Sequence, residues 1–253
     1  MKRSVRMIAS DLDGTLLRTD KTISGYTKTV LNQCRKLGIK VVYATGRGGS
    51  ANRVAPAQLF DGRISMNGAT AIVDDVVVYN RLIPYKEARP ILMACDKRGL
   101  KTTAELSGLH YSNFKTSDKW PDTTNYRIVD FSLLDIDAEK LNAIIDDSDD
   151  VSFIKDLLPK DYYLSVSRDG LAMVMHREAT KAKALAELAR IWGIAQSEIA
   201  AFGDDLNDID MLSFAGIGVA VENALDEVKA ASDQVCSNND EDGVAKWIEE
   251  NVF

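Results

Sequence analysis

The chain has 253 residues, of which 45% are hydrophobic and 27% charged, and its net charge at pH 7 is −7. This composition is typical of a globular protein with a substantial core, in one large domain or two modest ones. The negative charge argues against nucleic acid or an anionic membrane as the main partner, and no apolar run reaches the roughly 20 residues of a membrane span. Three widely spaced cysteines and a start without signal-peptide character predict a cytoplasmic protein with reduced thiols.

The first predicted strand is a short apolar run over residues 5–10 that ends in two carboxylates, Asp11 and Asp13. Gly14 and Thr15 then turn the chain. Two carboxylates this close repel each other unless a cation or a shared proton intervenes, and hard oxygen ligands suit magnesium. The same residues also fit a polar turn that caps a helix, because Asp, Gly and Thr are common in turns.

Strands and helices alternate through the next part of the chain. The patterns predict a helix over 24–37, a strand over 39–44, a helix from 49 or 50, a strand over 64–66 and a further strand over 76–79. The second strand ends in Thr45-Gly46-Arg47, and the third ends in Asn67-Gly68-Ala69. Alternation of this kind predicts a parallel sheet with helices on both faces, and such sheets bind ligands at the carboxyl ends of their strands.

From residue 84 the pattern changes to short strands with few helices, which predicts an α+β insertion over 84–175. The expected helices cover 87–98 and 138–146, and the expected strands cover 101–106, 109–113, 128–134, 151–155, 162–167 and 171–175. The first pattern then resumes, so residues 1–83 and 176–253 together are predicted to form one discontinuous domain. Its second half is predicted as a helix over 181–192, strands over 199–202, 217–221 and 234–236, helices over 209–214 and 224–231, and a final helix from 242 or 243.

The strand over 199–202 closes on an acidic cluster of Asp204, Asp205 and Asp208. Acidic residues in the first turn of a helix can simply complement its dipole. Together with Asp11 and Asp13 at the end of another strand of the same sheet, however, they predict a group of carboxylates that needs a divalent cation near neutral pH.

Three of these stretches resemble motifs of the haloacid dehalogenase-like (HAD) phosphatases. Asp11-Leu-Asp-Gly-Thr-Leu resembles the first motif, Ala44-Thr-Gly-Arg the second, and Gly203-Asp-Asp-Leu-Asn-Asp-Ile-Asp-Met-Leu the fourth in its Cof-type form. The resemblance implies a Rossmann-like parallel-sheet HAD core with an inserted α+β cap domain that sets substrate choice. It also implies roles for individual residues: a nucleophile at Asp11, an acid–base group at Asp13, a phosphoryl-binding Thr45, a substrate-facing Asn207, and Mg²⁺ held by Asp11, the backbone carbonyl of Asp13, Asp204 and Asp208. Asp205 occupies a variable place in the motif and is left out of the metal set.

The remaining candidates carry weaker signals. Gly46 and Arg47 extend the second motif towards the substrate, although an arginine in a turn can equally form a surface ion pair. Asn67 resembles a substrate-rim turn of the same branch or is a structural turn. A lysine at position 181 is either a solvated helix residue or the active lysine, and a cation in the first turn of a helix opposes the dipole unless an anion lies nearby. The family pattern has a Lys-Gly pair here, whereas this chain has Ala182, so Lys183 is an alternative; Thr180 as helix cap favours Lys181.

The sequence therefore predicts a Mg²⁺-dependent phosphatase that hydrolyses a small phosphorylated metabolite, such as a sugar phosphate, through an aspartyl-phosphate intermediate. A sugar phosphomutase similar to phosphomannomutases is the alternative enzyme, and a binding protein without catalysis is the alternative outside enzymology. The substrate itself and the choice between monomer and homodimer stay open.

Overall fold

The structure is a computed structural model that describes residues 5–121, 123–167 and 170–253. It divides into two compact units, one formed by Met1–Asn80 with Thr180–Phe253 and the other by Arg81–Ala179. The sequence placed the boundaries a few residues away, between 83 and 84 and between 175 and 176. Among the described residues, no helix has both the length and the apolar character that a membrane crossing requires.

The first unit is built on an eight-stranded sheet with the strand order β14-β13-β12-β1-β2-β3-β4-β5. Neighbouring strands from β14 to β3 are parallel, and β4 and β5 add an antiparallel edge. The two central strands, β1 and β12, are buried along their whole length, as expected for a parallel sheet covered on both faces. The strands are β1 (Met7–Ser10), β2 (Lys40–Ala44), β3 (Gly62–Ser65), β4 (Thr70–Val73), β5 (Val76–Asn80), β12 (Ile199–Gly203), β13 (Ile217–Val221) and β14 (Gln234–Cys236).

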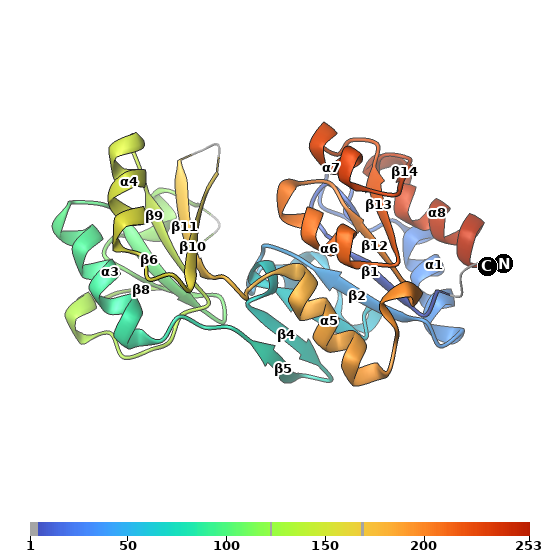
Figure 1. Cartoon of the computed structure of the whole chain (residues 1–253), viewed down its shortest axis with the longest axis horizontal. Helices are drawn as coiled ribbons and strands as arrows, with labels where there is room; N and C mark the ends of the chain where they lie inside the picture. The colour runs from blue at the N-terminus through green and yellow to red at the C-terminus, as the bar shows by residue number, and fades with distance from the viewer. Residues whose placement is uncertain (1–4, 122, 168–169) are drawn as a thin grey trace. The chain divides into compact units, whose positions relative to one another are not determined.

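Helices cover both faces of this sheet (Figure 1). On one face α1 (Gly25–Lys36) packs against α8 (Gly243–Val252) and β2; on the other, α5 (Lys181–Trp192) packs against α6 (Ile209–Phe214). The segment α7 (Asp226–Ala231) follows β13, and the helix expected from residue 49 or 50 is α2 (Ala51–Val54), a single turn. Side-chain caps begin the two longest helices of this unit, α1 and α5, because Ser24 Oγ accepts the Thr27 N–H and Thr180 Oγ1 accepts the Lys183 N–H.

The strand order reverses between β1 and β12. From β1 the chain proceeds through β2 and β3 towards one edge, and from β12 it proceeds through β13 and β14 towards the other. Loops that follow two adjacent parallel strands at such a reversal diverge, and they leave a crevice at the carboxyl ends. Asp11 follows β1 and Asp204 follows β12, so the topology brings the two predicted acidic stretches to the same crevice.

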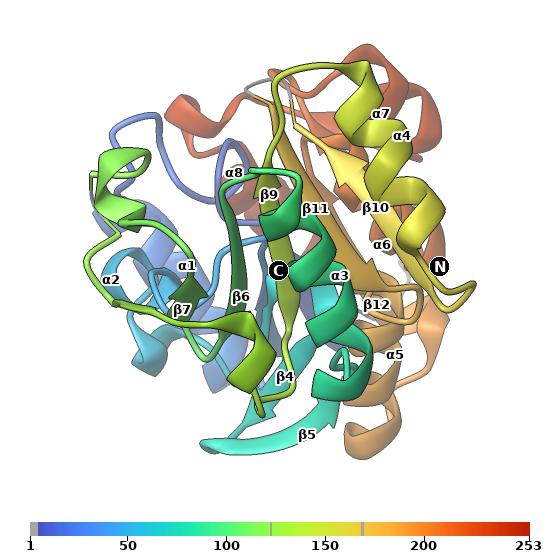
Figure 2. The same cartoon turned by 90° about the vertical axis from the view of Figure 1, so that its left-hand side faces the viewer.

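The second unit is a six-stranded sheet in the order β10-β11-β9-β6-β7-β8. Two helices, α3 (Tyr85–Lys97) and α4 (Ser148–Leu157), lie side by side over one face of it (Figure 2). A separate apolar core that includes Leu92, Leu141 and Ile154 fills the space between helices and sheet. The strands are β6 (Thr102–Leu106), β7 (Leu109–Ser112), β8 (Tyr126–Ile128), β9 (Lys140–Ile144), β10 (Tyr162–Val166) and β11 (Leu171–His176).

Three predictions for this unit were wrong. Residues 138–146, expected as a helix, contain the strand β9, in which Leu141 and Ala143 alternate into the core between β6 and β11. Residues 151–155, expected as a strand, belong to helix α4, which the side chain of Asp147 caps by accepting two backbone N–H groups. The strand expected over 128–134 ends at Ile128, and residues 131–133 form a 3₁₀ turn. Short apolar runs do not distinguish the helical from the strand periodicity, so contacts with neighbouring elements determine which structure forms.

Candidate active site

Asp11 lies at the centre of the crevice. Its backbone N–H continues the pairing of β1 with β12 by donating to the Phe202 carbonyl at 2.9 Å, and the residue is 6% exposed. Burial raises the pKa of the Asp11 carboxyl to about 8; the nearby Lys181 lowers it, while Asp208 and Asp204 raise it further. The group is thus held where an anion is costly unless cations surround it.

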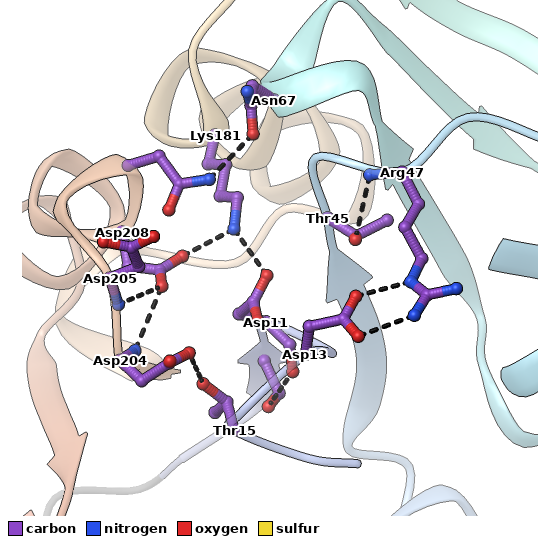
Figure 3. Close-up of polar contacts among 12 residues, drawn as sticks. Asp11, Asp13, Thr15, Thr45, Arg47, Asn67, Lys181, Asp204, Asp205 and Asp208 are labelled. Atoms are coloured by element: carbon purple, nitrogen blue, oxygen red, sulfur yellow. Dashed lines mark hydrogen bonds and ion pairs between the residues drawn. The ribbon is translucent and has the colours of Figure 1, made fainter. Parts of the chain in front are cut away.

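Lys181, the first residue of α5, supplies one such cation. Its Nζ donates to Asp11 Oδ1 and to Asp208 Oδ1, both at 2.6 Å, and its side chain is fully buried (Figure 3). Burial alone would lower the pKa of this ammonium, but the two carboxylates outweigh it and the net shift is upward. These carboxylates are the anions that a lysine in the first turn of a helix needs. Lys183, by contrast, is exposed.

Asp208 joins this lysine to the loop after β12. Its Oδ2 accepts the backbone N–H groups of Asp204 and Asp205 at 3.0 and 3.1 Å, while Oδ1 faces Lys181. The carboxylate fits because position 203 is glycine: a Cβ there would lie 2.4 Å from the Asp208 Cβ. Asp208 therefore holds in place both the Lys181 ammonium and the loop that carries Asp204.

Asp11, Asp204 and Asp208 form a candidate metal site, with one oxygen of each lying within 4.8 Å of the others. Thr15 Oγ1 donates to Asp204 Oδ1 at 2.6 Å, yet burial still raises the pKa of Asp204 to about 6. A set of three mutually repelling carboxylate oxygens is the environment that a hard divalent cation such as Mg²⁺ stabilises, so these residues fit the predicted metal. Asp205 is exposed and its side chain accepts the Leu206 N–H, which keeps it outside the group.

Asp13 is bound by two cations. Arg47 donates hydrogen bonds to both oxygens of its carboxylate, from Nε to Oδ2 and from Nη2 to Oδ1 at 2.6 Å. Lys21 Nζ donates to the same Oδ1 at 2.9 Å. Burial by itself would raise the pKa of Asp13, but these hydrogen bonds and charges lower it overall. Arg47 thus forms an ion pair with a residue of the site. Sequence reasoning missed Lys21 and the bond from Thr15 to Asp204, because nothing in the local pattern shows which carboxylate either side chain reaches.

The remaining predicted residues surround a pocket of about 280 Å³. Its lining consists of Asp11, Asp13, Thr45, Gly46, Arg47, Asp204, Asp205 and Asn207. Thr45 Oγ1 accepts the Arg47 N–H at 3.1 Å, which folds the turn after β2. Asn207 donates to Asn67 Oδ1 at 2.9 Å, so the turn after β3 meets the loop after β12 at the rim. The structure therefore brings every predicted site residue into one neighbourhood of the first unit.

Comparison with known proteins agrees with this arrangement. The haloacid dehalogenase-like hydrolase family matches residues 8–248. A similar curated protein is the 5-amino-6-(5-phospho-D-ribitylamino)uracil phosphatase YitU of Bacillus subtilis, 28% identical over 268 residues that cover 99% of this chain and 98% of the relative.

Solved structures agree as well. A HAD phosphatase of Bacteroides thetaiotaomicron is 27% identical with a TM-score of 0.85, covering 98% of this chain and 95% of that one. A sugar phosphatase of HAD subclass IIB is 28% identical with a TM-score of 0.82, covering 97% and 98%. The predictions of the superfamily, of the α/β fold class and of a phosphatase are confirmed. Matched over nearly its whole length, the chain belongs to the haloacid dehalogenase-like hydrolase family.

Proposed function

We propose that this phosphatase is Mg²⁺-dependent and hydrolyses a small phosphorylated metabolite through an aspartyl phosphate formed on Asp11. The observation that carries the proposal is the position of Asp11: a buried carboxylate that lines an open pocket, 2.6 Å from Lys181 and grouped with Asp204 and Asp208. A nucleophile in phosphoryl transfer needs nearby positive charge, because both it and its substrate are anionic.

The residues that would hold Mg²⁺ are Asp11, Asp204, the backbone carbonyl of Asp13, and Asp208. Asp208 would contribute the lone pair of Oδ1 that remains after its bonds to Lys181 and to two backbone N–H groups. When bound, the cation offsets the repulsion between the nucleophile and the phosphate and stabilises the charge that develops on the phosphoryl oxygens.

In the proposed mechanism, an oxygen of Asp11 attacks phosphorus and the bond to the alcohol oxygen breaks. Asp13 gives its proton to that leaving oxygen and later takes a proton from the water that hydrolyses the aspartyl phosphate. Asp13 must first carry a proton, which its bonds from Arg47 and Lys21 oppose. An incoming phosphate offers Arg47 an alternative partner of matching geometry, and this exchange would release Asp13 to be protonated.

The remaining predicted site residues, which do not include Asp205, are proposed to bind the substrate. Lys181 and the Thr45 hydroxyl hold the transferring phosphoryl group, with Gly46 giving close access to the backbone of that turn. Asn67 and Asn207, joined by their hydrogen bond, contact the substrate at the rim. Arg47 is proposed as the third contact of the phosphoryl group, beside Lys181 and Thr45.

The second unit, Arg81–Ala179, is proposed as the cap that selects the alcohol part of the ester. The sheet face opposite its helices carries a polar cluster: Glu105 lies 3.6 Å from both His110 Nε2 and Lys140 Nζ, and Thr103 accepts a hydrogen bond from Asn142. Asn142 Oδ1 is buried, and nothing in the described part of the chain donates to it. Buried acceptors of this kind suit a ligand with several hydroxyl groups. The relatives named for a ribityl phosphate and for sugar phosphates act on such esters, so we propose a sugar or polyol phosphate.

The test is hydrolysis of p-nitrophenyl phosphate by the wild type and by Asp11→Asn, each with Mg²⁺ and with excess chelator. Asp205→Asn is the matched control, since it removes a neighbouring charge outside the metal group. We expect activity that requires both the metal and Asp11 and that survives in the control. A folded wild-type protein that releases no phosphate from this ester or from a panel of sugar phosphates would overturn the proposal. Isomerisation of hexose phosphates without release of phosphate would indicate the mutase.

We propose that the enzyme works in the cytoplasm, where its three buried, unpaired cysteines stay reduced.

A further inference from the structure

The loop that follows β1 is attached to a distant part of the chain through its backbone carbonyl groups. Asn223 Nδ2 donates to the Gly14 carbonyl at 2.7 Å. Asn239 Nδ2 donates to the Leu17 carbonyl at 2.9 Å. Neither asparagine belongs to the three stretches that resemble family motifs, and both come from the part of the chain that follows β13.

The amide of Asn223 has a single orientation that satisfies both of its ends. Its Oδ1 accepts the backbone N–H of Asn239 at 3.0 Å, and a backbone N–H requires an oxygen as its partner. The nitrogen of the amide therefore faces the Gly14 carbonyl. Asn223 thus acts as a fixed bridge between Asn239 and the loop after β1.

The same turn also holds the loop after β12. The Leu225 N–H donates to the Asp204 carbonyl at 3.0 Å. The two loops meet each other as well, because Thr15 donates to Asp204 and because a Cβ on Gly14 would lie 2.4 Å from Asp204 Oδ2. Residues 223–225 therefore bind both of the loops that carry the carboxylates of the metal group.

We propose that Asn223 is a positioning residue of the phosphatase site: its hydrogen bond to the Gly14 carbonyl holds the Gly14–Thr15 peptide, and through it the adjoining Asp13–Gly14 peptide, in register with Asp204. This inference rests on the proposed function. Gly14 has φ +81°, a conformation that glycine reaches freely and leaves as freely, so the turn beside the nucleophile is intrinsically flexible. A restraint on its carbonyl limits the motion of the Asp13 carbonyl, the backbone group proposed as a ligand of the cation.

Asn223 is exposed, so its removal opens no cavity in the core and the fold should tolerate it. This separates a positioning role from a purely structural one. Asn238 provides the matched control because it lines the same cavity of about 500 Å³ as Asn223 and Gly14, while its side chain accepts the Glu241 N–H instead of reaching the loop. Changing it to aspartate adds charge to that cavity and preserves an acceptor at the helix cap.

The experiment compares the wild type with Asn223→Ala, Asn223→Asp and Asn238→Asp in three measurements. Hydrogen exchange of a peptide covering residues 11–17 reports on the loop without substrate or metal. Calorimetric titration with MgCl₂ reports on the metal site, and kcat and KM for p-nitrophenyl phosphate report on catalysis. We expect faster exchange and Mg²⁺ binding weaker by about five- to tenfold in Asn223→Ala, as the loss of one hydrogen bond implies. Asn223→Asp should be worse, since it sets a carboxylate oxygen against the Gly14 carbonyl, and Asn238→Asp should match the wild type.

Either of two results in the Asn223 variants would overturn the inference. One is unchanged exchange of the loop in both Asn223 variants, and the other is faster exchange with Mg²⁺ affinity and kcat within twofold of the wild type. Equal losses in Asn238→Asp would also refute it, by assigning the effect to charge or cavity shape. A wild-type protein that binds no Mg²⁺ and is inactive would instead refute the proposed function, and the exchange data would still decide whether Asn223 holds the loop.

Discussion

Replacement of Lys181 by methionine is the sharpest test of the electrostatic design of the site. The variant keeps a side chain of similar length and removes the charge that lies 2.6 Å from both Asp11 and Asp208. Removing one partner from a buried ion pair costs about 3 to 5 kcal/mol, because the remaining charge stays desolvated. Lys181 lowers the pKa of Asp11, so without this lysine the Asp11 carboxyl holds a proton more readily, which relieves part of the cost. We therefore expect a loss of about 3 kcal/mol, at the lower end of that range.

The stability of the first unit can be followed by urea titration, because Trp192 and Trp247 lie in it and supply a fluorescence signal. Hydrolysis of p-nitrophenyl phosphate should fall by about 10²- to 10³-fold, the usual effect of losing a preorganised charge at a reacting group. The control is Lys183→Met, an exposed position in the same helical turn, which should stay within about 0.5 kcal/mol of the wild type and keep its activity.

Added Mg²⁺ should stabilise Lys181→Met more than it stabilises the wild type, because the cation then balances carboxylates that have lost their lysine. The reasoning would be refuted if Lys181→Met unfolded at the same urea concentration as the wild type and kept more than a tenth of its activity. It would equally be refuted if the Lys183 variant lost as much as the Lys181 variant.

Three further outcomes follow from the same structure. Gly14→Ala should weaken Mg²⁺ binding and hydrolysis by at least about tenfold, because its Cβ would press on the Asp204 carboxylate. Gly38→Ala is the control: Gly38 has φ +79° and a Cβ there would meet nothing within 4 Å, so this variant should lose about 1 kcal/mol of stability and no activity. Equal activity losses in the two variants would contradict this reasoning. In Asp242, burial would raise the pKa, but bonds from Arg18 and neighbouring hydroxyls lower it, so its stabilisation is complete above the ordinary aspartate pKa of about 3.9 and disappears as the pH falls through the lowered value. Asp242→Asn should therefore be less stable by about 1 kcal/mol in urea titrations at pH 7, with the gap closing as the pH falls below the ordinary aspartate pKa, and a pH-independent gap would refute the assignment. Excess chelator should abolish hydrolysis and lower the thermal midpoint of the Mg²⁺-loaded wild type, and an unchanged midpoint would argue against a bound divalent cation.

Sequence patterns predicted the first unit better than the second for a physical reason. The buried strands of a parallel sheet are continuous apolar runs that end abruptly in polar turns, so β1, β2 and β12 are visible without knowledge of their neighbours. The strand β9 and the helix α4 carry short, mixed patterns that suit either periodicity. Residues 148–157 form a helix because the Asp147 side chain caps its first turn, and residues 140–144 form a strand because β6 and β11 pair with them on either side.

The sequence by itself determined which chemistry the chain can perform, because carboxylates, a threonine and a lysine at strand ends and helix starts are local features. Tertiary structure decided which of these groups meet. Lys181 lies 170 residues from Asp11 in the sequence, and its burial beside Asp11 identifies it, rather than Lys183, as the lysine of the site. Asn223 likewise contacts Gly14 although 209 residues separate them. Those pairings depend on the reversal of strand order between β1 and β12, which brings the ends of distant strands together, and no local pattern records that placement.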